Sequence, residues 1–278
     1  MTYDTGFIRN GEISRECFDP GVVRRELAII RDDLHCNAVQ LIGGDPGRLE
    51  LAAGYAAELG LEIWFSPYPL ELSPGEILAL FTDCAERAER VRKRGAEVVF
   101  VTGVELSIMN QGFMPGDSVD ERLGLLLSDP DRRRERLAEV SARVNGFLGK
   151  AVAITGFGTA AYRGAGDRGG RVMEILEYDE GTVTPVRLNG EYVRDEAGQA
   201  AYLAELLEIF DAEGVDGAFV FLFALEGFPH RPDGDPRLDL DLASLGIVKM
   251  LVGSSGDTYP DMAWEPKAAF TAVAECYR

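Results

Sequence analysis

A glutamate at the end of an apolar segment is the residue of this chain best suited to acid–base chemistry. Glu105 follows the apolar stretch Val98–Val104, which predicts a buried strand. A carboxyl group between Val104 and Leu106 at such a strand end is expected to lose part of its hydration, and this raises its pKa toward the range of a general acid. The alternative is a solvated glutamate with no chemical role.

A glycine-rich turn follows another apolar segment, Ala151–Thr155. Residues 156–161 have the spacing GxGxxA, which is similar to a dinucleotide-binding fingerprint, and Glu177 lies near the distance expected of a ribose-binding acid. That fingerprint must open a helix whose N-terminus holds the pyrophosphate. Four glycines between Gly164 and Gly170 disfavour a helix there. We therefore expect no nucleotide, and we expect no other cofactor.

Metal-binding patterns are weak in this sequence. There are two histidines, His35 and His230, which argues against a histidine-based zinc site. The acidic run at 233–241 lacks the spacing and the terminal glutamate of a calcium loop. We interpret that run as a solvated loop and expect no metal.

Composition narrows the class of partner. The chain has 278 residues, 46% of them apolar, and a formal net charge of −19, so it repels phosphate backbones and we expect no nucleic-acid binding. No apolar run approaches the roughly 18 residues of a membrane span, and residues 1–10 do not resemble a secretory signal. We expect no membrane partner. Four scattered cysteines without a CxxC pair are typical of a cytoplasmic protein.

Strand-like and helix-like segments alternate along the chain, which predicts a parallel α/β sheet. Expected strands are Tyr3–Ile8, Asn37–Ile42, Leu61–Phe65, Val98–Thr102, Ala151–Thr155 and Ala218–Phe223. Expected helices are Pro20–Asp33, Pro46–Leu59, Ser73–Arg94, Asp129–Leu148, Asp195–Glu213 and Pro266–Tyr277. No linker divides the chain, so we expect one domain over residues 1–278. A doubly wound sheet and a (β/α) barrel both fit, and the long polar loops after the strands favour the barrel.

Several stretches together resemble one family. They are Tyr3–Gly6, Ile30–Val39, Gly103–Leu106, Ile154–Gly158 with Tyr162–Ala165, Tyr192–Glu196 with Gln199–Ala200, and Trp264–Phe270. The pattern resembles the actinobacterial proteins labelled abortive phage infection proteins, which are in turn similar to clan A glycoside hydrolases on a (β/α)8 TIM barrel. The resemblance runs over most of the chain and is more specific for fold than for substrate.

The resemblance implies roles for two positions. In such hydrolases a glutamate at the end of the fourth strand is the acid/base, and Glu105 matches it. The nucleophile is the glutamate of a Thr-Glu-Phe-Gly pattern on the seventh strand, which here reads Thr155-Gly156-Phe157-Gly158. The nucleophile position is therefore Gly156, and ordinary retaining hydrolysis, which needs two carboxylates, loses one of them.

The chain also departs from the family in the number of its units. Six βα units are clear instead of eight, and the fifth and sixth are missing, so we expect a shortened or distorted barrel. Val172–Leu176 and Val183–Leu188 are candidate extra strands. Unpaired strand edges are a liability, so either these segments or a second copy of the chain should cover the gap. We expect a homodimer.

The leading hypothesis is a glycoside-hydrolase-like barrel acting on a sugar or glycosylated small molecule, with Glu105 as acid/base. We expect the ligand to be bound by Phe65, Tyr68, Asn110, Gln111, Phe113, Tyr162, Arg163, Phe223 and Glu226. One alternative is a barrel enzyme of small-molecule biosynthesis that uses a carboxyl group for dehydration or cyclisation. Another is a pseudoenzyme that binds a ligand without catalysis, since barrels host many functions.

Overall fold

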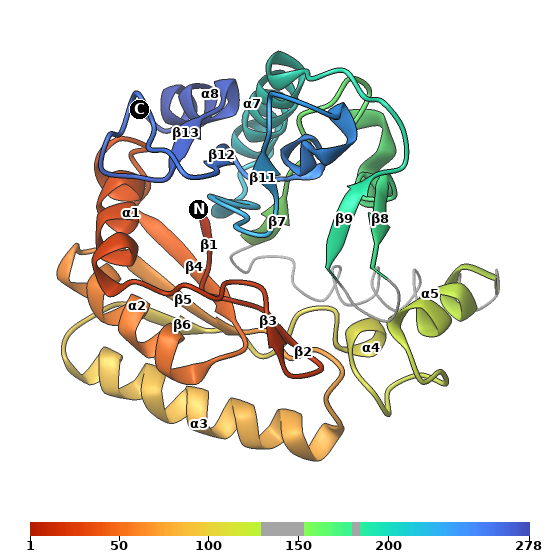
Figure 1. Ribbon diagram of the computed structural model, residues 1–278. Helices are drawn as coiled ribbons and strands as arrows, with labels where there is room; N and C mark the ends of the chain where they lie inside the picture. The colour runs from red at the N-terminus through yellow and green to blue at the C-terminus, as the bar shows by residue number, and fades with distance from the viewer. Residues whose placement is uncertain (129–152, 180–183) are drawn as a thin grey trace.

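A curved parallel sheet is the centre of the computed structural model, which describes residues 1–128, 153–179 and 184–278 (Figure 1). Four strands pair in parallel in the order β1 (Thr2–Asp4), β4 (Ala38–Gly43), β5 (Glu62–Pro67) and β6 (Val98–Phe100). These are four of the expected strands, with bounds shifted by a few residues. The prediction of an α/β fold with a parallel sheet is confirmed.

Two further strands extend this sheet at its other side. β7 (Ala153–Phe157) and β10 (Gly217–Val220) pair in parallel. The Phe223 N–H donates to the Thr2 carbonyl at 3.0 Å, which places the chain after β10 beside β1. The strands therefore follow one another in the order β7, β10, β1, β4, β5, β6.

The sheet curls toward a barrel. β5 and β10 are separated by two strands, which would place them about 14 Å apart in a flat sheet. The rings of Trp64 on β5 and Phe219 on β10 nevertheless lie 4.8 Å apart, centroid to centroid. This contact requires the strands to curve around a common concave face.

A closed barrel is not formed by the described residues, because within them no pairing joins β6 to β7. The candidate extra strands do not fill this gap. β8 (Leu176–Tyr178) and β9 (Pro185–Leu188) pair with each other as an antiparallel hairpin, apart from the main sheet (Figure 1). The helix expected over Asp129–Leu148 lies outside the described residues.

Helices cover the convex face of the sheet, and the first three start within one residue of their expected positions. α1 (Pro20–Asp32), α2 (Pro46–Glu58) and α3 (Pro74–Lys93) each have proline at the first turn, where its missing N–H costs nothing. The side chains of Asp19, Asp45 and Ser73 accept hydrogen bonds from the first-turn N–H groups. α7 (Glu196–Ala212) and α8 (Ala268–Cys276) pack against each other next to β10.

Short elements complete the ends of the sheet. α4 (Leu106–Met109) and α5 (Val119–Ser128) follow β6, and β2 (Ile8–Arg9) with β3 (Glu12–Ile13) forms a hairpin after β1. β11 (Pro229–His230), β12 (Val248–Leu251) and β13 (Trp264–Pro266) form a separate three-stranded sheet. The 3-10 helices are η1 (Gly166–Arg171), η2 (Pro236–Leu238) and η3 (Leu240–Ala243). Among the described residues, no helix combines the length and apolar character needed to cross a bilayer.

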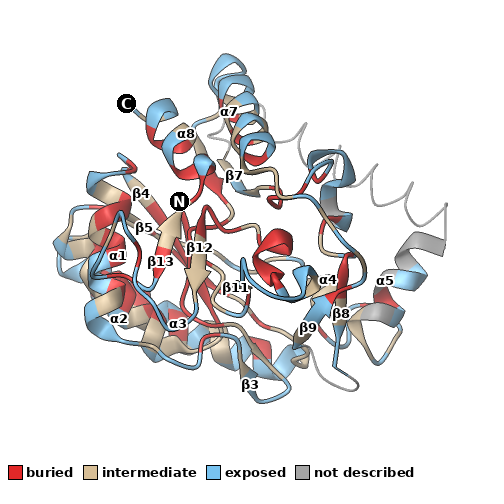
Figure 2. Cartoon of the chain, turned by 45° about the horizontal axis from the view of Figure 1, so that its top comes forward, coloured by how far each residue is buried: buried red, intermediate tan, exposed pale blue. Residues whose placement is uncertain are grey.

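The apolar core lies between the sheet and its helices, where the buried residues of Figure 2 concentrate. Val39, Leu41 and Ile63 point from the strands to this side and are fully buried. The concave face also carries buried polar groups. The Thr2 hydroxyl lies 3.2 Å from Gln40 Oε1, and Gln40 Nε2 lies 3.5 Å from the Ser66 hydroxyl.

Candidate active site

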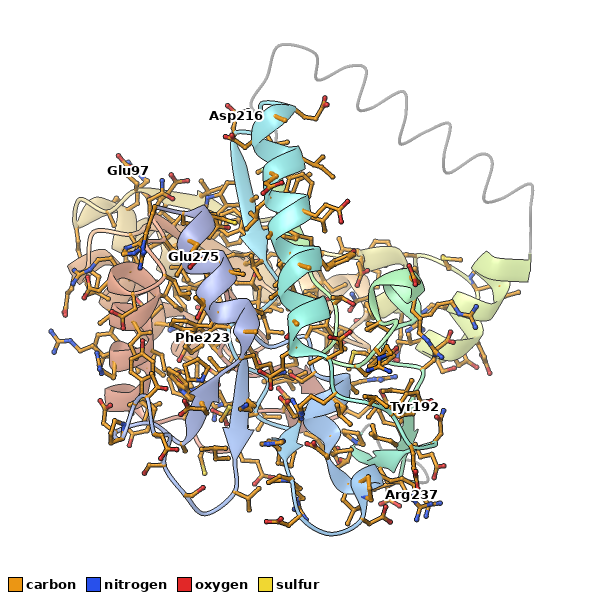
Figure 3. All side chains as sticks on the ribbon, turned by 90° about the horizontal axis from the view of Figure 1, so that it is seen from above. Glu97, Tyr192, Asp216, Phe223, Arg237 and Glu275 are labelled. Carbon is orange, nitrogen blue, oxygen red and sulfur yellow. The ribbon has the colours of Figure 1, made fainter. Side chains whose placement is uncertain are left out.

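The parallel strands define two ends of the molecule. Glu97 and Asp216, which precede β6 and β10, lie away from Tyr192 and Arg237 (Figure 3). In parallel α/β sheets and barrels the ligand side is the one at the carboxyl ends of the strands. A ligand-binding site is therefore expected among the segments that follow β1, β4, β5, β6, β7 and β10.

Glu105 meets Tyr68 at this end. The Tyr68 hydroxyl, which follows β5, donates to Glu105 Oε2 at 3.1 Å. Glu105 is the N-cap of α4 and has a left-handed backbone with φ of +48°. The expectation that the Glu105 carboxyl is desolvated is wrong, because the residue is exposed. The start of α4 turns it away from the core.

Tyr68 is the better buried member of this pair. Burial, with a further contribution from the Glu105 carboxylate, raises the pKa of Tyr68 above its ordinary value. The phenol is therefore protonated at neutral pH and serves as a hydrogen-bond donor. The Phe7 ring meets the Tyr68 ring edge-on at 5.0 Å, so the segment after β1 fixes the plane of the tyrosine.

A cavity of about 260 Å³ lies beside Tyr68. It is enclosed by the β2–β3 hairpin, the loop after β5, and α3. Its lining includes Ile8, Asn10, Tyr68, Leu70, Leu72 and Leu80. Because Tyr68 faces both the cavity and Glu105, a ligand with an apolar part could fill the cavity and present a polar part to the carboxylate.

Gly156, the position at which the family resemblance expects a nucleophile, lies exposed on β7. Among the described residues, a Cβ atom added there would contact the Phe221 side chain alone, at 3.9 Å, which is an ordinary van der Waals distance. The described part of the structure thus leaves room for a Cβ atom at this position.

Three of the expected ligand-binding rings lie in the core instead of at a surface. Phe65 is fully buried and stacks with Phe100 at 6.3 Å. Phe223 is fully buried against Trp264. Tyr162 is 3% exposed, and its hydroxyl donates to the Val172 carbonyl. It belongs to a smaller buried hydrophobic cluster that also contains Ile175 and Leu188. None of these rings presents a face to a ligand in this structure, because neighbouring side chains pack against them.

The other expected ligand-binding residues divide between loop support and solvent. Asn110 is buried and holds the loop after β5: its Oδ1 accepts from Leu72 N–H and its Nδ2 donates to the Pro69 carbonyl. Gln111, Phe113 and Arg163 are exposed. Phe113 is the one of these with a large apolar surface open to solvent, with 45% of it exposed.

Glu226 belongs to a charge cluster that the sequence did not reveal as a unit. Arg15 Nε lies 2.7 Å from Glu226 Oε1, and Arg15 Nη2 lies 3.2 Å from Glu26 Oε2. Asp4, at the carboxyl end of β1, is buried beside them and accepts from the Gly6 N–H. Burial raises the pKa of Glu226 to about 7 and that of Asp4 to about 6, although Arg15 favours both charged forms.

This cluster makes stability depend on pH. Because the folded protein binds the Glu226 proton more tightly than the unfolded chain does, its contribution is present at low pH and is lost as pH rises through about 7. Between pH 5 and pH 8, the free energy of unfolding of the wild type should therefore decrease. In Glu226→Gln, which lacks this titrating group, we expect that decrease to be smaller by about 1–3 kcal/mol. Urea unfolding at both pH values measures this. Equal falls in both proteins would contradict the assignment.

A second charge network corrects the interpretation of the acidic run at 233–241 as a solvated loop. Asp241 is fully buried between two cations: its Oδ1 lies 2.8 Å from Lys267 Nζ, and its Oδ2 lies 2.8 Å from Arg194 Nη1. Asp239 pairs with Arg194 at 2.8 Å and with His230 at 3.0 Å. The network joins η3 to the starts of α7 and α8. Its cations come from positions distant in sequence, so no local pattern announces it.

Comparisons with known proteins add one structural likeness. No family model matches the chain, and no curated protein matches its sequence. The resemblance to abortive phage infection proteins therefore has no family match behind it. Among solved structures, the chain is similar to one described as "Complex structure of GH113 beta-1,4-mannanase", with 11% identity, 92% of each chain covered and a TM-score of 0.49. A likeness of this degree says nothing about activity or substrate.

Proposed function

We propose that this chain is a glycoside-hydrolase-like enzyme that acts on a sugar or a glycosylated small molecule at the carboxyl ends of its parallel strands. Glu105 is the acid/base. The observation that carries the proposal is the hydrogen bond from the Tyr68 hydroxyl to Glu105 at 3.1 Å, beside the cavity that Tyr68 lines. The carboxyl group is exposed, and therefore accessible to a ligand, while a partly buried donor fixes its orientation.

The arrangement allows one half of a retaining reaction. Protonated Glu105 gives its proton to the oxygen of the leaving group as the bond to the anomeric carbon breaks. The positive charge that develops at the anomeric carbon then needs a nucleophile. Gly156 offers none, so water or a small external anion must attack.

A second candidate function rests on Glu226. Its pKa of about 7 and its partial exposure suit a group that both takes and gives a proton near neutral pH. A carboxyl group of this kind could catalyse dehydration or cyclisation of a small metabolite without any nucleophile. Analysis of products separates this reaction from glycoside cleavage. If the protein binds a ligand without converting it, and if neither Glu105→Gln nor Glu226→Gln changes that result, the protein is a pseudoenzyme.

Restoring the lost carboxylate tests the first candidate. Because a Cβ atom at Gly156 would make no contact closer than 3.9 Å with the described residues, we expect Gly156→Glu to fold and to cleave activated aryl glycosides slowly. Imperfect support of the new side chain limits its rate. Phenol release from an aryl-glycoside panel measures the effect, and Gly156→Gln is the matched control without a titrating group. If folded Gly156→Glu and the wild type cleave no member of the panel, the glycosidase proposal fails and the second candidate takes its place.

We also propose that the chain forms a homodimer. In the described residues β6 and β7 end the strand order without a further partner strand, and Val99 on β6 is 36% exposed. A second copy of the chain would cover such edges, and two-fold dimers are the commonest oligomers. Light scattering at micromolar concentration should give twice the chain mass of 30.3 kDa. A mass of one chain would contradict the proposal.

A further inference from the structure

A buried ion pair lies behind the Tyr68–Glu105 contact. Glu71, three residues after Tyr68, accepts from Arg122 of α5, with 2.7 Å between Nη2 and Oε2. The two side chains are 8% and 0% exposed. Arg9 approaches the other oxygen of Glu71 at 3.3 Å. An arginine with no solvent contact must satisfy its hydrogen-bond donors within the protein. The acceptors of Arg122 therefore identify the segments that it connects.

Arg122 joins three segments through one guanidinium group. Besides Glu71, it donates through Nε to the Ile108 carbonyl of α4 at 2.6 Å and through Nη1 to the Gly116 carbonyl at 3.1 Å. Glu105 is the cap of the same short helix, and its carbonyl accepts from the Ile108 N–H at 3.1 Å. The arginine therefore fastens the helix that begins at Glu105 to the loop that carries Tyr68.

The backbone at both ends of this connection is unusual. Glu71 has a φ of +56° and Glu105 a φ of +48°, a left-handed conformation that non-glycine residues adopt at a cost. The Glu71 N–H donates to the Met109 carbonyl at 2.8 Å, so the two turns are also joined through the main chain. Such conformations persist where surrounding contacts determine them. The Arg122–Glu71 pair is the buried ion pair that links the two segments, beside the hydrogen bonds of Asn110 with Leu72 and Pro69.

We infer that the Arg122–Glu71 pair is a positioning device that holds the Tyr68 hydroxyl against the Glu105 carboxylate. This inference rests on the proposed function of Glu105 for its meaning, but the contact that it explains exists whether or not the protein is an enzyme. Neither residue is a catalytic residue, since both act through Tyr68 and Glu105.

The phenol of residue 68 reports directly on this contact. Glu105 is the charged group that faces Tyr68, and its carboxylate disfavours ionisation of the phenol. If the pair is broken and the two segments separate, the phenol should ionise at a lower pH. The protein carrying 3-fluorotyrosine at position 68, whose phenol ionises at a lower pH than that of tyrosine, allows this titration to be followed by 19F NMR.

We expect Arg122→Gln and Glu71→Gln to lower the midpoint of residue 68 by about one pH unit or more. Their midpoints should approach that of Glu105→Gln, which removes the carboxylate itself. Arg122→Lys keeps one donor of the fork and should restore part of the shift. Arg171→Gln is the matched control, since Arg171 forms an exposed ion pair with Glu174, and it should keep the wild-type midpoint.

Glu71→Gly separates the ion pair from the backbone turn, because glycine adopts the left-handed conformation easily but has no carboxylate. The inference predicts that its midpoint falls as in Glu71→Gln. If folded Glu71→Gln and Glu71→Gly both titrate at residue 68 with the wild-type midpoint, the inference is overturned. This test holds even if Arg122→Gln does not fold. The titration needs no substrate, so absence of catalysis would defeat the proposed function alone.

Discussion

Glu105→Gln is expected to lower turnover of a cleaved glycoside by about 10² to 10⁴-fold, the range typical of a lost general acid or base. Glutamine keeps the shape of the side chain and can still accept the Tyr68 hydrogen bond, so folding should not change. The titrating group is lost. Steady-state rates on the best substrate of the aryl-glycoside panel measure the effect.

Two controls sharpen this prediction. Glu97→Gln replaces an exposed glutamate at the opposite end of β6 and should leave the rate unchanged. Substrates with better leaving groups need less protonation, so the loss in Glu105→Gln should shrink as the phenol becomes more acidic. A loss smaller than about threefold on every substrate, with unchanged folding, would remove Glu105 from the mechanism.

The largest effect on stability is expected at Asp241. Asp241→Asn leaves Lys267 and Arg194 in place without their shared carboxylate, and Lys267 is buried. Breaking a buried ion pair by removing one partner typically costs about 3–5 kcal/mol. Urea unfolding of the variant should therefore show a loss of this size in the free energy of unfolding.

Asp233→Asn is the matched control for this prediction. It lies in the same acidic run and is exposed, so its loss should stay within about 0.5 kcal/mol. The double variant Asp241→Leu/Lys267→Met should recover part of the lost free energy of unfolding. It removes both charges of the Asp241–Lys267 pair, so the lysine is no longer buried without its carboxylate. A loss below about 1 kcal/mol in Asp241→Asn would show that water reaches the network.

Local signals in the sequence identified most of the elements. Apolar segments located the six parallel strands, and helical periodicity with proline in the first turn located the starts of α1 and α3, which Asp19 and Ser73 cap. These features depend on residues close together in the chain, where periodicity and capping chemistry act. The resemblance of Gly103–Leu106 to an acid/base strand end also led to Glu105, which the structure pairs with Tyr68.

Long-range pairing could not be predicted from the sequence. Asp241 is buried because Arg194 and Lys267 reach it from other elements, and nothing near Asp241 in the chain distinguishes it from the exposed Asp233. The exposure of Glu105 depends on where α4 begins, which apolar periodicity does not determine. Phe65 and Phe223 are residue types that often line sugar-binding sites. In the structure, however, the surrounding helices and strands pack against their rings in the hydrophobic core.

If Glu105 protonates a leaving group while the nucleophile position at Gly156 stays empty, an external anion can complete the reaction. The most direct test is 1H NMR of the products that the wild-type protein forms from an activated aryl glycoside in the presence of azide. Azide is expected to accelerate phenol release from the wild-type protein and to give a glycosyl azide with inverted anomeric configuration. On a substrate with a poorer leaving group, Glu105→Gln should form none of this azide. Unchanged substrate, with no azide adduct from any glycoside tested, would contradict these roles of Glu105 and Gly156.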